Sequence, residues 1–546
     1  MSAAPQHAPE YPEAIDSAVL KVAGVVVLGA IMSILDITVV NVALATFQTA
    51  FSTDETPLDY SAVAWTVTGY TLALATVIPL TGWAADRFGT KRLYMSALAL
   101  FTIGSVLCAT ATSIEMLVAF RVVQGLGGGM LMPLGMTMLT RAAGPKRMGR
   151  LMALLGVPML LGPILGPILG GYLIDNHSWH WIFLINVPVG ALALAYAWWA
   201  LAKDSPEPSE SFDWIGMALM SPGLALFLYG VSSIPGEGSF FNWKTEVFGT
   251  IGVLMIVAFV FYSFKPKHPL LDLRLFANRN LTVATVTMVL FAGAFFGGLL
   301  LMPQYLQEVR DKTPMGAGLI MAAQGLGAMI TMPIAGALVD KFPVGRIVPF
   351  GLVAIIGGMF ALTQLTADSS QWGFIIPVLF VMGLGMGATM MPVMTSAIKT
   401  LTHHQVARGS TLLNITQQVA SSIGVAVLSV VLTNRIKNSA VIAQSQQFAE
   451  AARSVSDPSQ LATLLAKFPA VAQVIAPFGQ DQAAAQAALA RAVKEALASA
   501  FASTYWVAAS IITLTLVAAF FLPRKHEESH LLDDDEGDPA PAVVMH

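Results

Sequence analysis

Long apolar runs separated by short polar segments dominate the chain. A run of about 18 or more mostly apolar residues is long enough to cross a bilayer as a helix. Fourteen such runs occur, at residues 22–47, 61–81, 93–112, 116–139, 150–174, 181–201, 214–232, 246–264, 281–305, 315–339, 347–366, 372–398, 409–433 and 502–522. The first is longer than a signal peptide and follows a polar, proline-containing stretch, so we expect it to stay as a span. The pattern predicts an all-α integral membrane protein with 14 transmembrane helices.

The basic residues are distributed unequally between the two sides of these spans. With both termini in the cytoplasm, the cytoplasmic segments hold 19 Lys and Arg residues and the short outer loops hold three. Basic residues favour the cytoplasmic side of a membrane. The asymmetry therefore predicts cytoplasmic termini and supports the even number of spans.

Composition confirms the class and excludes others. Hydrophobic residues make up 55% and charged residues 11% of the 546, and the mean hydropathy is +0.69. A soluble globule of this size needs more polar surface. The net charge of -3 and the scattered bases give no nucleic-acid surface. The single cysteine, Cys108, provides no metal site. The adjacent pair His403 and His404 has no further ligands nearby in the sequence, so we expect no metal and no cofactor.

An internal repeat organises the spans. Gly82, Asp86, Phe88 and Arg92 recur at the same offsets in the segment 336–346. The Gly-rich fourth span has a weaker copy in the twelfth. Both copies are eight spans apart, which fits two six-helix bundles separated by an inserted helix pair and predicts a binding site between the halves. The expected organisation is a tail (1–18), a first bundle (19–201), the inserted pair with its loops (202–280), a second bundle (281–522) that includes an outer loop (434–500), and an acidic tail (523–546).

Asp36 is the first candidate for chemistry. It lies in the middle of the first apolar run, where a charge costs about 3 kcal/mol or more. A buried carboxyl favours its protonated form, which suits a group that takes up and releases protons. Arg121, in the outer part of the fourth span, lies at a depth that allows a charge partner for Asp36. The alternatives are a carboxyl that only ties helices together and an arginine that extends to the outer headgroups.

Four motifs carry a family resemblance. They are Leu35 to Leu44 in the first span, the Gly82 to Arg92 loop, Arg121-Val-Val-Gln124-Gly125, and Gly166-Pro167-Ile-Leu-Gly170-Gly171 with Gly162 before it. In this order they resemble the major facilitator superfamily, and within it the fourteen-span drug:proton antiporter family. The chain departs from the family pattern at Ala45, where proline is usual, and at Ala153, where glycine is usual.

The resemblance implies roles for the motif residues. Asp36 and Arg121 would couple transport to protons, and the loops would close the cytoplasmic side through Gly82, Asp86, Arg87, Gly89, Lys91, Arg92, Asp340, Lys341 and Arg346. The antiporter motif of the fifth span is Gly162, Gly166, Pro167, Gly170 and Gly171. Read from the residues alone, the loops could simply anchor bases at the membrane, and the glycines could simply allow close helix packing.

Candidates for a substrate pocket lie in the glycine-rich fourth and twelfth spans and in the thirteenth. They are Met130, Met136, Met390, Met394, Asn414, Gln417 and Gln418. Flexible thioethers suit a cavity that accepts dissimilar apolar ligands. Methionines that only face lipid, and amides that only tie helices together, are the alternatives.

The outer loop 434–500 has two helical patterns with apolar faces that need a partner. A cap on the carrier's own outer surface or on lipid headgroups is favoured over a dock for an extracytoplasmic adaptor protein, which some relatives of the resembled family use.

Together these features predict a secondary transporter, not an enzyme, that exports amphipathic or cationic drugs in exchange for protons across a bacterial cell membrane. The chain has no Gly-x-x-x-x-Gly-Lys-Ser/Thr loop for ATP, so protons are the expected coupling ion. The alternatives are a dedicated exporter of a lipid or endogenous metabolite and a membrane scaffold or sensor that moves nothing.

Overall fold

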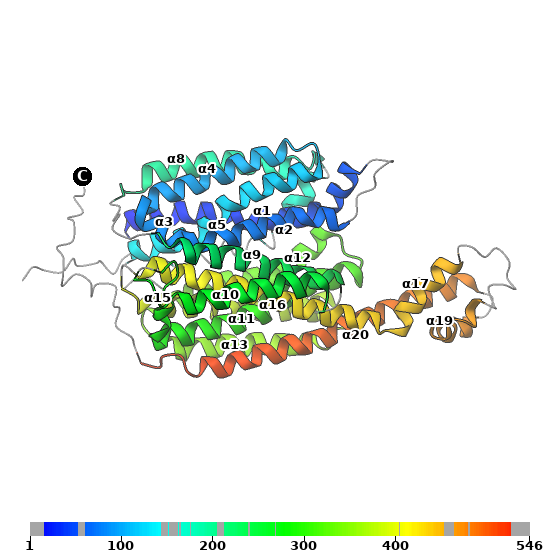
Figure 1. Cartoon of the computed structure of the whole chain (residues 1–546). Helices are drawn as coiled ribbons and strands as arrows, with labels where there is room; N and C mark the ends of the chain where they lie inside the picture. Colours follow the sequence, from blue (N-terminus) through cyan, green and yellow to red (C-terminus); the bar gives the residue numbers. More distant parts are fainter. Residues whose placement is uncertain are drawn as a thin grey trace, which may run out of the picture.

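The computed structural model is an elongated bundle of helices (Figure 1). It describes residues 16–52, 60–143, 151, 162, 165–166, 168–174, 176–204, 212–237, 241–267, 269–402, 405–452, 464–478 and 481–525. Within these residues, 13 helical stretches are long and apolar enough to cross a membrane. Most of the predicted fifth span lies outside the described part of the chain. The all-α membrane fold predicted from the sequence is confirmed.

The first group of helices contains the motifs of the predicted first bundle. Its members are α1 (Ser17–Phe51), α2 (Tyr60–Val77), η1 (Ile78–Leu80), α3 (Thr81–Phe88), α4 (Thr90–Ala109), α5 (Ile114–Ala143), α7 (Trp181–Leu184) and α8 (Asn186–Ala200). The stretch from α2 through η1 to α3 forms one span. We call the end of the bundle where α1 begins the inner end, and the end where α1 stops the outer end.

The second group repeats this arrangement. Its members are α11 (Arg279–Glu308), α12 (Pro314–Val339), α13 (Val344–Leu362), η4 (Gln371–Ile375), α14 (Ile376–Gly387), α15 (Met390–Lys399), α16 (Val406–Lys437) and α20 (Gln482–Ala519). The predicted twelfth span is interrupted, because α14 ends at Gly387 and α15 begins at Met390. The residues in the gap, Ala388 and Thr389, include a buried threonine whose hydroxyl donates to the carbonyl of Gly385.

Close backbone contacts hold the second group together. A Cβ atom on Gly424 of α16 would overlap with the carbonyl oxygen of Gly293 of α11. In lipid the hydrophobic effect does not drive helices together. Small residues favour association because they let the backbones approach and make van der Waals contacts. Gly424 therefore fixes the distance between α11 and α16.

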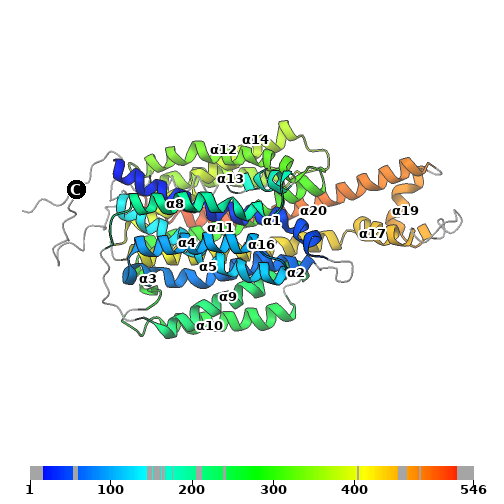
Figure 2. The same cartoon turned by 90° about the horizontal axis from the view of Figure 1, so that it is seen from above.

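The inserted pair lies at the side of the bundle (Figure 2). It consists of α9 (Trp214–Glu237), η2 (Thr245–Gly249) and α10 (Thr250–Tyr262), and η3 (Leu273–Ala277) leads into α11. Helix α9 packs against α2 of the first group and against α16 of the second. Its contacts include the stacked rings of Trp65 and Tyr229 and a buried cluster that joins Ile78, Leu224 and Ile415.

The inner end of the inserted pair is tied by one buried carboxylate. Asp213 accepts hydrogen bonds from the backbone N–H of Gly216 (2.8 Å), the hydroxyl of Tyr262 (2.9 Å) and the backbone N–H of Leu270 (3.1 Å). These donors belong to the start of α9, the end of α10 and the following connection. Asp213 thus joins three segments that are apart in sequence.

A helical arm extends beyond the bundle at the outer end, opposite the end where α1 begins (Figures 1 and 2). It is built from α17 (Ala440–Ala452), α19 (Pro469–Ile475), η5 (Ala476–Phe478) and the first part of α20. The sequence placed the start of the last helix at residue 502, but α20 begins at Gln482. Exposed ion pairs connect this extension to the outer loops of the second group, from Arg491 to Asp368 (2.9 Å) and from Lys494 to Asp311.

Candidate functional site: a buried carboxylate and the loop at the inner end

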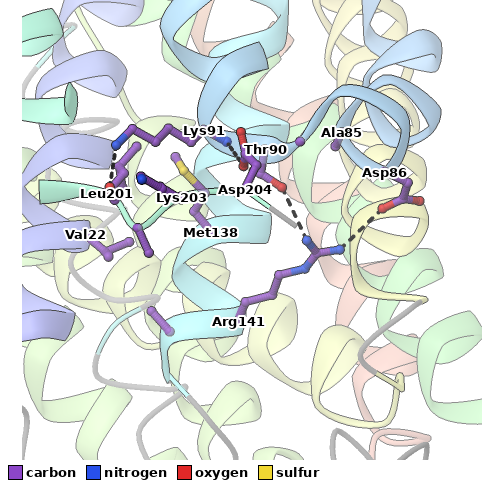
Figure 3. Close-up of a pocket in the computed structure, with 13 residues that line it drawn as sticks. Val22, Ala85, Asp86, Thr90, Lys91, Met138, Arg141, Leu201, Lys203 and Asp204 are labelled. Atoms are coloured by element: carbon purple, nitrogen blue, oxygen red, sulfur yellow. Dashed lines mark hydrogen bonds and ion pairs between the residues drawn. The ribbon is translucent and has the colours of Figure 1, made fainter. Parts of the chain in front are cut away.

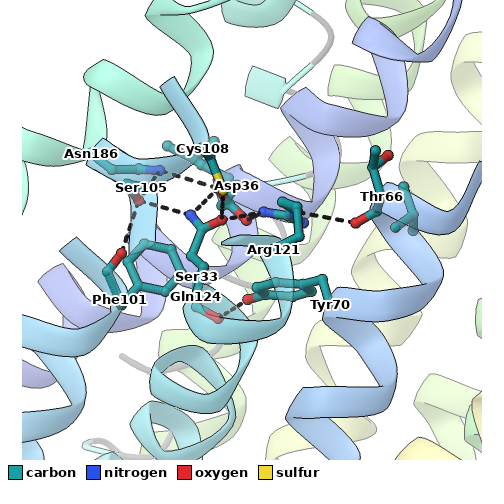
Figure 4. Close-up of polar contacts among 12 residues, drawn as sticks. Ser33, Asp36, Thr66, Tyr70, Phe101, Ser105, Cys108, Arg121, Gln124 and Asn186 are labelled. Atoms are coloured by element: carbon teal, nitrogen blue, oxygen red, sulfur yellow. Dashed lines mark hydrogen bonds and ion pairs between the residues drawn. The ribbon is translucent and has the colours of Figure 1, made fainter. Parts of the chain in front are cut away.

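Asp36 and Arg121 form an ion pair inside the first group of helices (Figure 4). Arg121 Nη1 donates to Asp36 Oδ2 at 2.5 Å, and both side chains are fully buried. Asp36 comes from the middle of α1, and Arg121 comes from the outer part of α5. The structure brings together the two residues that the sequence selected as a charge pair.

Two amide groups complete the surroundings of the carboxylate. Gln124 Nε2 donates to Asp36 Oδ1 at 2.7 Å, and Asn186 Nδ2 donates to the same oxygen at 3.1 Å. The carboxylate therefore accepts three hydrogen bonds from three side chains of two other spans. Every side chain that bonds to the carboxylate does so as a hydrogen-bond donor. Such surroundings suit an ionised carboxyl group, since charge-assisted hydrogen bonds are stronger than neutral ones.

Arg121 is held on the opposite side by the second span. Its Nε donates to the backbone carbonyl of Thr66 at 3.1 Å, and its guanidinium carbon lies 4.1 Å from the centre of the Tyr70 ring. The hydroxyl of Tyr70 is within 3.3 Å of the hydroxyl of Ser33 on α1. Arginine suits this position because its planar cation can pair with a carboxylate and stack on an aromatic ring at once.

An apolar layer lies between this site and the outer end. It is formed from α1, α7 and the turns near them and includes Phe47, Trp179, Ile182 and Phe183. The rings of Phe47 and Trp179 meet edge to face with centres 5.5 Å apart. The ion pair is thus separated from the outer surface by packed side chains, which keeps the surroundings of the charges at low dielectric.

The described glycines of the antiporter motif lie against α1 on both sides of Asp36. A Cβ on Gly162 would overlap with Ile34, and one on Gly166 would overlap with Thr38. Gly170 lies against Val39, Gly171 has open space, and Pro167 is outside the described residues. Small residues at these positions let the fifth span approach the turn of α1 that carries the carboxylate.

The loop between α3 and α4 forms a second polar site, at the inner end (Figure 3). Gly89 has φ +91°, a conformation that L side chains rarely adopt, and it ends α3 and precedes α4. Asp86 pairs with Arg141 of α5 at 3.4 Å, and Arg141 also donates to the hydroxyl of Thr90 at 3.3 Å. A cavity of about 350 Å³ lies beside these residues.

Asp204 and Lys91 hold two helix ends together at this loop. The carboxylate of Asp204, four residues beyond α8, accepts from the backbone N–H groups of Lys91 (2.8 Å) and Arg92 (2.9 Å). The ammonium of Lys91 donates to the carbonyls of Leu201 (2.5 Å) and Trp198 (2.9 Å) at the end of α8. Each charge therefore lies at the helix end whose dipole favours it. A Cβ on Gly89 would overlap with Asp204, so close contact is a second reason, besides the positive φ, for glycine at this position.

The corresponding loop of the second group is held by a backbone atom. The N–H of Gly345, at the position equivalent to Lys91, donates to the carbonyl of Pro523 at 2.9 Å. Pro523 stands four residues beyond α20, as Asp204 does beyond α8. Asp340 directly follows the last residue of α12, and Lys341 and Arg346 are exposed. In the first loop, Gly82 is buried and Arg87 is exposed.

The residues predicted to line a substrate pocket lie on three helices, α5, α15 and α16. Met136 and Asn414 meet between α5 and α16, where Asn414 Nδ2 donates to the sulfur of Met136 at 3.4 Å. Met390 and Met394 are buried on α15, and Met130, Gln417 and Gln418 are half-buried. The structure therefore connects two of the candidates across the two groups of helices.

The sequence prediction missed several residues of the polar network. Asn186, Ser105, Thr66 and Tyr70 are neutral, so their place inside apolar spans drew no attention. Gln124 carried a usable signal, because it follows Arg121 by three positions and thus shares its helix face. Asp204 sits in a polar connection, where a carboxylate is ordinary. His403 and His404 lie outside the described residues, and no group of three or more metal-ligating side chains occurs within them.

The fold and the buried ion pair define a membrane transporter, and the comparisons place it in a family. Residues 26–425 match the model of the Major Facilitator Superfamily. The "Multidrug resistance protein B homolog" of Mycobacterium tuberculosis is 44% identical over 528 residues, covering 95% of this chain and 93% of the relative. "Multidrug export protein EmrB" of Escherichia coli is 30% identical, covering 75% and 79%.

Solved structures show the same fold. The proton:xylose symporter XylE matches with a TM-score of 0.58 at 16% identity, covering 95% of this chain and 99% of that one. The chain belongs to the major facilitator superfamily and, within it, to the fourteen-span drug:proton antiporter family. It is a multi-pass membrane transporter with bacterial homologues and is not an enzyme, as the sequence predicted.

Proposed function

We propose that this chain exports structurally diverse amphipathic or cationic compounds from the cytoplasm and is driven by protons through alternating access. The observation that carries the proposal is the fully buried ion pair of Asp36 and Arg121 in the first group of helices. The multidrug names of its relatives support the cargo class. Each proton that enters under a potential of 100 mV supplies about 2.3 kcal/mol.

We assign Asp36 the role of proton carrier, and its buried contacts support this assignment. When ionised, it is stabilised by Arg121, Gln124 and Asn186. A proton on the carboxyl removes its charge and weakens its bond to Arg121, which loosens the link between α1 and α5. In the proposed cycle Asp36 is protonated from outside, the halves rock inward, the compound displaces the proton, and the loaded carrier returns outward.

Arg121 has the role of a fixed positive charge. Its contacts with Thr66 and Tyr70 keep the guanidinium in place whether or not Asp36 is charged. A cation beside a carboxyl favours loss of the proton. Arg121 therefore promotes the release step.

We assign the gate to the two loops at the inner end, which we place in the cytoplasm together with both termini. In this state Asp86 is paired with Arg141 within the first group, and the loops hold the inner ends of α4 and α13. The contacts of α3 and α5 with α16 join the two groups near this end. Those contacts must separate when the carrier opens inward. The moving parts would be the two predicted bundles, residues 19–201 and 281–522.

For the cargo, we propose a pocket near Met136 and Asn414, where α5 meets α16. The helical arm lies within the predicted outer loop 434–500. We propose that it caps the carrier's outer face, and its ion pairs with Asp368 and Asp311 support this. Docking of an adaptor protein is the alternative for the same surface.

The test is transport by the purified full-length chain in liposomes with an imposed pH gradient, with ethidium as the first probe. The wild type should accumulate the probe against its gradient, and Asp36→Asn should lose that concentrative uptake. Asp368→Asn, which changes an exposed aspartate, is the matched control and should behave as the wild type. Concentrative uptake by Asp36→Asn at the wild-type level would overturn the coupling assignment. If the wild type moves none of a panel of compounds, the scaffold alternative is favoured.

A further inference from the structure

Asn186 is a buried amide in an otherwise apolar span. It is the first residue of α8, and 4% of its surface is exposed. Its Nδ2 group has two hydrogens and meets two acceptors, Asp36 Oδ1 at 3.1 Å and Ser105 Oγ at 3.3 Å. A buried polar group without partners costs roughly 1–3 kcal/mol, so this full pairing accounts for its stable placement.

A small cavity touches the same two side chains. It has a volume of about 50 Å³ and lies between α1, the fifth span and the α7–α8 region. Asp36 and Asn186 are its polar lining residues, and the others are apolar, among them Leu35, Leu169 and Val189. This volume exceeds what one water molecule requires, and Asp36 and Asn186 both carry oxygen atoms that can accept hydrogen bonds from water.

Arg121 does not line this cavity. The carboxylate thus has different neighbours on two sides: Arg121 and Gln124 on the side of α5, and the amide of Asn186 beside the cavity on the side of α8. The other titratable groups of the described residues that face Asp36 are Tyr70 from α2 and Cys108 from α4.

We propose that Asn186 is a positioning residue of the proton site, which holds the ionised Asp36 carboxylate beside the cavity through which its proton passes. The inference rests on the proposed function. When a proton from outside is relayed through water in the cavity to the carboxylate, the negative charge of Asp36 is lost, the water stays neutral, and the bond from Asn186 weakens. The amide keeps Ser105 as an acceptor, so it stays in place and can donate again after release.

The test measures protonation of Asp36 without any cargo. Dicyclohexylcarbodiimide reacts with protonated carboxyl groups in apolar surroundings, and its attachment to Asp36 is read by peptide mass spectrometry. The full-length chain in lipid nanodiscs is labelled across a pH series. Asn186→Ala removes one donor to the ionised form, so more of Asp36 should be labelled at a given pH and the labelling midpoint should lie at a higher pH than in the wild type.

Three further variants separate positioning from structure. Asn186→Ser keeps a donor and should bring the midpoint back toward the wild type. Asn176→Ala changes an exposed asparagine that bonds to a backbone carbonyl, and it should leave the midpoint unchanged. Val189→Phe fills the cavity and should slow labelling without moving the midpoint.

Two results would overturn the inference. One is a wild-type midpoint in Asn186→Ala, and the other is a folded wild type in which Asp36 is not labelled at any pH. The proposed function fails separately, through concentrative uptake by Asp36→Asn. Loss of uptake in Asp36→Asn together with an unchanged midpoint in Asn186→Ala would reject the role of Asn186 alone.

Discussion

Replacing Asp204 by alanine removes the acceptor that holds the inner end of α4. Two backbone N–H groups, of Lys91 and Arg92, lose the carboxylate that they contact at 2.8 and 2.9 Å. Loss of a side chain that caps a helix start costs roughly 0.5–2 kcal/mol. Two N–H groups lose their acceptor, which favours the upper part of this range even though Asp204 is partly exposed and water replaces some of the lost interaction. We therefore expect about 1–2 kcal/mol of local destabilisation.

Hydrogen exchange of the full-length protein in nanodiscs measures this directly. A local loss of about 1.4 kcal/mol corresponds to tenfold faster exchange, so the peptide that contains Lys91 and Arg92 should exchange roughly 5 to 30 times faster in Asp204→Ala. Asp204→Asn keeps one oxygen acceptor and should give an intermediate rate.

Lys91→Met serves as the matched control. It removes the donor to the carbonyls of Trp198 and Leu201 but keeps the backbone N–H that Asp204 binds. Faster exchange should then appear after α8 and not at the start of α4. Unchanged exchange at the start of α4 in Asp204→Ala would refute the proposed holding role.

Three other substitutions test the packing and the arm by thermal unfolding of the full chain. Asp213→Ala leaves three donors without their acceptor and should destabilise the inserted pair by about 2–4 kcal/mol; a melting temperature equal to that of the wild type would contradict this. Gly424→Val should force α16 away from Gly293 and cost about 1–3 kcal/mol, whereas the same change at Gly357, which has open space, should cost less. Arg491→Ala should leave the melting temperature unchanged because its ion pairs are solvent-exposed; a clear drop would show that the arm depends on them.

The sequence predicted the fold well because each span carries its own signal. Apolar length identifies a helix that crosses the bilayer, and the repeated Gly82 and Gly336 loops identify the two halves. Asp36 and Arg121 could be paired because charges inside apolar spans are rare and need partners. The two side chains form an ion pair in the structure, so the energetic cost of a charge inside a span was enough to predict its partner.

The remainder of the site depends on contacts that leave no local pattern. Asn186 and Ser105 are neutral residues whose importance comes from a carboxylate on another helix. The length of α20 was missed because its first part is alanine-rich and polar, which the search for apolar spans passes over. The interruption between α14 and α15 was missed because the apolar pattern continues across residues 388–389.

The two loops at the inner end differ in how they respond to mutation. The first depends on the carboxylate of Asp204, which a single base change can remove. The second depends on the carbonyl oxygen of Pro523, and every amino acid supplies that atom. Chance substitutions can therefore weaken the first half's clamp at a single position, while the second half's counterpart withstands side-chain changes there. Variation among relatives should accordingly be more restricted at the Asp204 position than at the Pro523 position.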